Sequence, residues 1–366
     1  MMHKRSRTSL VLSACGVLAV GLAGGTWAAT SAKAATSAAT NPAHTPTWHT
    51  VLSLANTNAI DTVVATGQTS GWAFPLDSSV AYERTGNTAW KRVGMPEKGG
   101  SVNVAEATSP SDVWAAYHTA TGTHLDRWNG TKWTTLKSFP GQVTALTVLG
   151  PNDVWAFGGL INSTSRLPQG VFHFNGHGWT EVTSAFQSGY AVSDRSVWAV
   201  TGTTIEHFNG SRWSAASVAG LFPAPTPAET TKPELTGIVA LAANDVYATG
   251  NGPLGAHIAN GVILHYNGHA WSRAARAGFI SAVGQQFASD DRGGLWLSAE
   301  NVEGPSLLFH YSAGKVTQVT LPSSSGSLTG SNSVSRIPGT AQALSGGAIF
   351  NASNAAADRA VVFELS

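Results

Sequence analysis

The stretch Gly150-Pro151-Asn152-Asp153-Val154-Trp155-Ala156-Phe157-Gly158-Gly159 decides how this chain folds, because degraded copies of it recur along the sequence. Its first four residues predict a turn, since proline presets φ at the second turn position and Asn and Asp side chains bond nearby backbone groups. The apolar run that follows is rich in β-branched and aromatic residues and ends in a glycine doublet. This pattern predicts a short strand that is buried on both faces.

A second unit follows the first along the chain, as in Val171-Phe172-His173-Phe174-Asn175-Gly176-His177-Gly178-Trp179. Asn-Gly between apolar runs is the strongest short hairpin signal, because both central residues of a type I′ turn need a positive φ. The second unit therefore predicts two further strands that are joined by a tight turn and end near a tryptophan.

The spacing of the two units predicts the architecture. The second unit closes at seven places, and the first unit aligns on six aromatic residues and a faded seventh copy, with steps of 41 to 49 residues. Repeats of roughly forty to fifty residues with four strands each are typical of propeller blades. We therefore predict an all-β, seven-bladed β-propeller of four-stranded blades. The aligned positions are Trp72, Trp114, Trp155, Trp198, Tyr247, Trp296 and Gln342 for the first unit, and Trp48, Trp90, Trp133, Trp179, Trp213, Trp271 and Val316 for the second.

The two ends of the repeat array predict how the ring closes. The last repeat ends in the strand-like run 360–365 and lacks a closing strand, whereas the segment around Trp48 is left over at the start. We expect this segment to pair with the C-terminal strand, because closure removes unpaired sheet edges that would otherwise promote aggregation.

Residues 1–34 have the pattern of a signal peptide, with a basic start, an apolar run from Leu10 to Gly25 and the small-residue pattern Ala32-Lys33-Ala34. A lipoprotein signal at Cys15 is the alternative, although the apolar run continues well past that cysteine. Residues 35–46 are rich in Ala, Thr, Ser and Pro and predict a flexible linker. The propeller domain is expected to occupy 47–366.

Charge and cysteine content limit the possible partners. Without the leader, 17 basic residues face 20 acidic ones, a net charge of −3, so a nucleic-acid partner is not expected. Cys15 is the only cysteine, and packing rather than disulfides must then stabilise the domain. No sequence pattern for a metal, phosphate or nucleophile site is present, and we expect no cofactor, no membrane span after the leader and a monomer.

The repeats resemble those of the secreted actinobacterial β-propellers that carry Asp-Val-Trp-Ala repeats and are related to kelch and galactose-oxidase-like propellers. The resemblance covers the expected domain and rests on Asp112-Val113-Trp114-Ala115, Asp153-Val154-Trp155-Ala156, Asp245-Val246-Tyr247-Ala248 and the Asn-Gly units. It implies the fold and says little of activity, because such propellers host many functions. The cysteine–tyrosine copper chemistry of galactose oxidase is not implied, because the domain has no cysteine.

Loop lengths indicate which face of the ring binds a ligand. The turns before the Trp strands and the Asn-Gly hairpins are short and uniform, whereas the loops on the opposite face vary in length. Variable loops carry function in most scaffolds. We therefore expect a ligand site on the variable face near the ring axis. Its candidate residues are His118, His124, Arg166, His257, Asn260, Arg276, Glu300, Glu303 and Arg359.

Three functional hypotheses follow. The favoured one is a secreted, non-catalytic binding or scaffold propeller for a glycan or protein of the cell envelope or medium. The alternative is a secreted polysaccharide hydrolase or lyase with Glu300 and Glu303 as acid and base, although these residues also fit solvated loop charges. The third is a structural partner in an envelope assembly. We expect the repeat aromatics to form core, and we expect the equivalent residues His173, His207, His265 and His310 to pack rather than share a metal, because equivalent positions diverge from the axis.

Overall fold

The computed structural model describes residues 46–366 apart from 225–230, 254–260, 278–286, 302–303 and 352. Residues 46–366 form one compact unit. The leader expected at 1–34 and all but the last residue of the linker expected at 35–46 lie outside the described residues.

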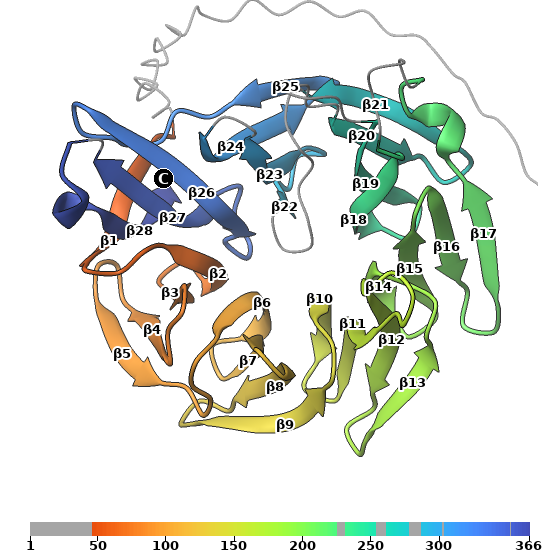
Figure 1. The fold of residues 1–366 in the computed structure, drawn as a ribbon, viewed down its shortest axis with the longest axis horizontal. Coiled ribbons are helices and arrows are strands. Elements are labelled where there is room, and N and C mark those ends of the chain that lie inside the picture. Colours follow the sequence, from red (N-terminus) through yellow and green to blue (C-terminus); the bar gives the residue numbers. More distant parts are fainter. Residues whose placement is uncertain (1–45, 225–230, 254–260, 278–286, 302–303, 352) are drawn as a thin grey trace, which may run out of the picture. The chain divides into compact units, whose positions relative to one another are not determined.

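The strands of this unit form seven four-stranded antiparallel sheets, which confirms the predicted seven-bladed β-propeller. Figure 1 shows the sheets arranged around a common axis, with β2, β6, β10, β14, β18, β22 and β26 nearest the centre. Blades 1 to 3 are β2 (Ile60–Gly67), β3 (Ser70–Pro75), β4 (Val80–Thr85) and β5 (Trp90–Gly94); β6 (Ser101–Ser109), β7 (Asp112–Thr119), β8 (Gly122–Trp128) and β9 (Trp133–Phe139); and β10 (Val143–Gly150), β11 (Asp153–Ile161), β12 (Pro168–Phe174) and β13 (Trp179–Thr183). Blades 4 to 6 are β14 (Ser188–Ser193), β15 (Ser196–Thr201), β16 (Thr204–Phe208) and β17 (Trp213–Ser217); β18 (Glu234–Ala242), β19 (Asp245–Asn251), β20 (Gly261–Tyr266) and β21 (Trp271–Ala277); and β22 (Phe287–Ser289), β23 (Leu295–Asn301), β24 (Gly304–Ser312) and β25 (Lys315–Gln318).

Blade 7 joins both ends of the unit. Its strands are β26 (Ser327–Arg336), β27 (Ala343–Asn351), β28 (Arg359–Leu365) and β1 (Trp48–Ala55), in the order β1-β28-β27-β26. Strand β1 is antiparallel to β28, with Trp48 opposite Leu365 and Thr50 opposite Phe363. The predicted closure of the ring by the N-terminal strand is therefore confirmed.

The alignment of the seventh repeat on Gln342 is wrong by two residues. In blade 2, Trp114 lies opposite Arg127, one residue before the Trp128–Trp133 pair. In blade 7 the pair Leu365–Trp48 is equivalent to the pair Trp128–Trp133. The residue before Leu365 is Glu364, and Leu344 lies opposite it, as Trp114 lies opposite Arg127. Leu344 therefore occupies the aromatic position. The sequence alone misplaced it because this blade has no aromatic residue there.

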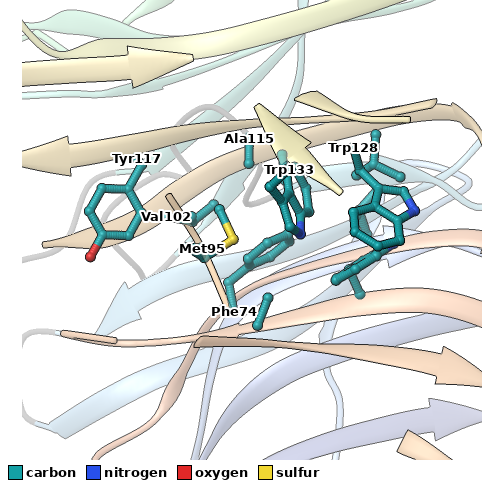
Figure 2. Packing of buried hydrophobic residues seen from close by; sticks show 12 residues of the cluster. Phe74, Met95, Val102, Ala115, Tyr117, Trp128 and Trp133 are labelled. Atoms are coloured by element: carbon teal, nitrogen blue, oxygen red, sulfur yellow. The ribbon is translucent and has the colours of Figure 1, made fainter. Parts of the chain in front are cut away.

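The core of the molecule lies between neighbouring blades. The six repeat aromatics are between 0% and 8% exposed, as predicted for core residues. Between blades 1 and 2, Trp133 packs edge-on against Trp72 and Phe74, with ring centroids 5.1 and 5.9 Å apart. Figure 2 shows Phe74, Met95 and Trp133 in this cluster. Aromatic contacts of this kind add to area burial and fix how each blade sits on the next.

The four equivalent histidines are structural, as expected. Each stacks on the repeat aromatic of its own blade, at centroid distances of 4.1 to 4.4 Å. The second interaction of each is a hydrogen bond: His173, His265 and His310 bond Asp153, Asp245 and Asp290 at 2.7–2.8 Å, and His207 bonds Ser196 at 3.0 Å. No group of three or more metal-ligating side chains occurs among the described residues.

Within the described residues, two short 3-10 helices, η1 (Ala219–Leu221) and η3 (Ala355–Ala357), lie in the connections of blades 4 and 7. In the part of the chain that the structure describes, no helix has the length and apolar character needed to cross a membrane.

Candidate functional site

The candidate site is a cavity of about 480 Å³ at the ring axis, which residues from six blades line. Its walls include the ends of the innermost strands, such as Ala107 of β6 and Arg336 of β26, and residues just beyond them, such as Asp245 and Asp291. The cavity therefore lies towards the short turns that precede the repeat strands.

Strand register explains which residues line the cavity. Val64, Glu106, Tyr190, Val239 and Ala288 each lie opposite the repeat aromatic of their own blade and eight residues before it in the sequence. All five line the cavity. Blade 3 is the exception, because its equivalent residue Thr147 is buried and accepts a hydrogen bond from the Ala191 backbone N–H.

Polar groups from several blades lie in or beside this cavity. Arg336 Nη1 of blade 7 contacts Asp291 Oδ1 of blade 6 at 2.7 Å, and His265 Nε2 contacts Asp245 Oδ1 at 2.7 Å. Burial, together with the nearby Glu106 carboxylate, raises the pKa of Tyr190 to about 12, although Arg336 acts to lower it. These two charged groups come from blades 2 and 7, whereas Tyr190 belongs to blade 4.

The arrangement fits recognition of a polar ligand. Three carboxylates, one guanidinium and one phenol line the cavity, together with apolar residues such as Phe287 and Leu241. Convergence of polar groups from several blades in a concave site is one mark of a ligand pocket. Among these groups, Asp291 contacts Arg336 and Asp245 contacts His265.

The structure places the candidate residues from the sequence in several separate positions. His118 and His124 lie on β7 and β8 of blade 2, but they point to opposite faces of the sheet, because His124 lies opposite Tyr117 and His118 opposite Thr123. Arg166, Arg276 and Arg359 belong to blades 3, 5 and 7. His257, Asn260 and Glu303 lie outside the described residues, as does the side chain of Glu300 in β23.

The described candidates have local partners. His118 Nε2 contacts the Val143 carbonyl at 3.1 Å, and burial lowers the pKa of His118. Arg359 Nη1 donates to the Ala356 and Asp358 carbonyls at 3.2 and 2.8 Å. Arg166 lines a hollow of about 340 Å³ between the loops of blades 2 and 3. The prediction of a ligand site on the variable face stays a prediction.

His124 belongs to a small polar cluster around Asp126. His124 Nδ1 is 3.0 Å from Ser138 Oγ and 3.6 Å from Glu97 Oε1. Asp126 is fully buried and accepts a 2.7 Å hydrogen bond from Thr135 Oγ1, whereas its Oδ2 has no hydrogen-bond partner. Burial raises the pKa of Asp126 to about 6, and Glu97 adds to this rise.

This raised pKa predicts a pH-dependent stability. A carboxyl whose folded pKa exceeds its unfolded value contributes stability below the unfolded pKa, near 3.8, and that contribution is lost as pH rises through about 6. We expect the stability advantage of the native chain over Asp126→Asn to fall by about 2–3 kcal/mol between pH 4 and pH 8. Urea unfolding of both chains across this range measures it; parallel pH profiles would contradict it.

The residues of the axial cavity, Glu106, Tyr190, Asp291 and Arg336, were not among the sequence candidates. Glu106 and Tyr190 could have been found in the sequence, because each lies eight residues before the repeat aromatic of its blade. Arg336 has the same spacing from Leu344, but this appears only after Leu344 replaces Gln342 in the alignment. Asp291 follows β22 in a turn and has no such signal.

Solved structures similar to this chain share its fold at low sequence identity. YCF48 bound to D1 peptide has a TM-score of 0.55 and 12% identity, over 87% of this chain and 96% of that one. The WD40 β-propeller domain of Doa1 has a TM-score of 0.58 and 12% identity, over 88% and 97%. Streptogramin B lyase has a TM-score of 0.52 and 11% identity, over 88% and 97%. No protein-family model and no curated protein matches the chain.

Proposed function

We propose that this protein is a secreted, non-catalytic binding or scaffold propeller that recognises a glycan or a protein of the cell envelope or medium. The observation that carries the proposal is the axial cavity, which Glu106, Tyr190 and Arg336 from three blades line together. The rigid ring holds these groups at fixed positions, so a ligand does not have to order them on binding.

Secretion is supported by the sequence of residues 1–34, which has the basic, apolar and small-residue regions of a signal peptide. The resemblance of the Asp-Val-Trp-Ala repeats to those of secreted actinobacterial, kelch-related propellers supports the same location. Anchoring through Cys15 is the alternative. Peptides deserve a place among the probes because YCF48, a chain with the same fold, was solved with a peptide bound.

Binding through the axial cavity is tested with a glycan array and a peptide array, and the best ligand is titrated calorimetrically. We expect Arg336→Gln and Tyr190→Phe to weaken binding about tenfold each, because each removes a hydrogen bond of a partly buried group. Arg166→Gln serves as the control, since Arg166 is exposed in a loop outside this cavity.

One outcome would contradict only the assignment of the ligand to the axial cavity, and two would contradict the proposed function. If Arg166→Gln abolishes binding and Arg336→Gln leaves it intact, the ligand binds the variable loops. Conversion of the bound glycan into shorter products would identify the chain as a hydrolase or lyase. No ligand in either array would remove recognition of these two classes as the function.

A further inference from the structure

A second feature, independent of the axial cavity, is the outer edge of blade 4. Strand β17 is the last strand of its sheet, and four of its five residues are exposed. Its sequence, Trp-Ser-Ala-Ala-Ser, has no ionisable side chain, whereas each of the other six outer strands has at least one. Natural proteins use charges on edge strands to prevent pairing with other chains, and β17 lacks this protection.

The register of β16 and β17 shows which backbone groups are available at this edge. The Asn209 N–H donates to the Arg212 carbonyl, and the Val218 N–H donates to the Thr203 carbonyl. Hydrogen-bonded and non-hydrogen-bonded pairs alternate in an antiparallel ladder. The N–H and C=O groups of Trp213, Ala215 and Ser217 therefore point away from β16 and towards the unpaired side.

A groove of about 620 Å³ lies beside this edge, between β16 and β17 of blade 4 and the β20–β21 hairpin of blade 5. Ser214 and Ala216 lie opposite His207 and Ile205, which also line the groove, so these two small side chains face into it. The opposite wall includes Tyr266 and Trp271. Small residues on β17 thus leave an aromatic-walled space that the described residues do not fill.

Charge limits what can occupy this groove. No acidic side chain is among the described residues that line it. Arg212 immediately precedes β17 and is exposed, and Arg273 Nη1 reaches the Leu221 carbonyl at the other end of the groove at 3.0 Å. Arg212 precedes the groove-lining segment 214–218 in sequence and Arg273 bonds Leu221 of the groove wall, so these two arginines favour an occupant with carboxylates on either side of its apolar part.

We propose that β17 binds an extended peptide segment of a partner protein as a fifth, antiparallel strand. The peptide bonds the free groups of Trp213, Ala215 and Ser217, places a large apolar side chain in the groove and presents acidic residues to Arg212 and Arg273. Main-chain pairing supplies affinity in such complexes, and pockets for alternate side chains supply specificity. A second copy of this chain fits less well, because its own β17 offers only serine and alanine to the space between Tyr266 and Ile205.

The test uses ten-residue β-prone peptides with a central tryptophan flanked by Asp and Glu, and matched peptides flanked by Lys. Fluorescence anisotropy with the full chain is expected to show binding of the acidic set and at least tenfold weaker binding of the basic set. Ala215→Pro removes one outward N–H and no bond to β16. We expect it to weaken binding at least tenfold, since the loss of one hydrogen bond also disturbs its neighbours along the strand.

The matched control is Glu181→Pro, because Glu181 has the same outward register in the outer strand of blade 3. It introduces the same substitution at another edge and should leave binding unchanged. Ala216→Phe, which fills the groove and keeps the backbone edge, should abolish binding. Circular dichroism and melting curves verify that each variant is folded.

Binding that Ala215→Pro and Ala216→Phe leave unchanged would overturn the proposal, as would no binding of the acidic peptides. A dimer of this chain that Ala215→Pro dissociates, without peptide binding, would identify a second copy as the occupant and also overturn it. Peptide binding that Arg336→Gln abolishes and Ala215→Pro spares would place the peptide in the axial cavity. That result would reject this inference and leave the proposed function standing.

Discussion

Replacing Trp155 with alanine is expected to lower the free energy of unfolding by about 3–5 kcal/mol. Trp155 is 2% exposed, stacks on His173 at a centroid distance of 4.3 Å and belongs to the cluster between blades 3 and 4. Its indole N–H has no hydrogen-bond partner, so the loss comes from packing and from the cavity left behind. Urea unfolding of Trp155→Ala and the native chain measures the difference.

Arg166→Ala is the control for this prediction, because Arg166 is exposed and such substitutions usually change stability by less than about 0.5 kcal/mol. Any ligand affinity of the surviving fold should be nearly unchanged in Trp155→Ala, since the indole lies between blades and does not line the axial cavity. Equal melting temperatures for Trp155→Ala and the native chain would refute the assignment of the repeat aromatics to the core.

Removing Arg84 is the second change from which we expect a large effect. Arg84 Nη2 contacts Glu364 Oε2 at 2.8 Å, and the two side chains are only 3% and 10% exposed. This pair joins blade 1 to the C-terminal strand of blade 7, next to the ring closure. Arg84→Met leaves the buried Glu364 carboxylate with only His49 Nε2, 3.8 Å away, as a basic neighbour, and we expect a loss of about 3–5 kcal/mol in the free energy of unfolding.

Two further variants separate this effect from lost packing. Arg84→Met/Glu364→Leu removes both charges and is expected to be more stable than Arg84→Met alone. Arg336→Met breaks the pair with Asp291, which is more exposed than the Arg84–Glu364 pair, and should cost no more than about 1 kcal/mol. If Arg84→Met and Arg336→Met melt at the same temperature, the buried pair does not hold the ring closed.

Blade count and ring closure could be predicted from the sequence because each depends on local chemistry that recurs. The Pro-Asn-Asp turn, the aromatic strand and the Asn-Gly hairpin each form from neighbouring residues, and their repetition makes weak local signals reliable. The prediction failed in blade 7, where Leu344 replaces the aromatic residue and Gln342 was taken in its place. One lost marker was enough to shift the alignment.

The candidate site could not be predicted in the same way. Loop length pointed to the variable face, whereas the axial cavity formed by the described residues lies among the ends of the innermost strands. Glu106 and Arg336 look unremarkable in the sequence, because a single polar residue near a strand end is common on any protein surface. Their importance comes from facing the same axis, which no local pattern records.

The sequence by itself determined that seven similar sheets form a ring and that the first strand completes the last sheet, because turn and strand preferences act over a few residues and repeat with a regular period. The tertiary structure alone decided which distant residues meet: Tyr190 with Glu106 and Arg336 at the axis, Arg84 with Glu364 at the closure, and β17 with the groove beside Trp271. These long-range contacts depend on the angle between neighbouring blades, and the side chains packed between the blades set that angle.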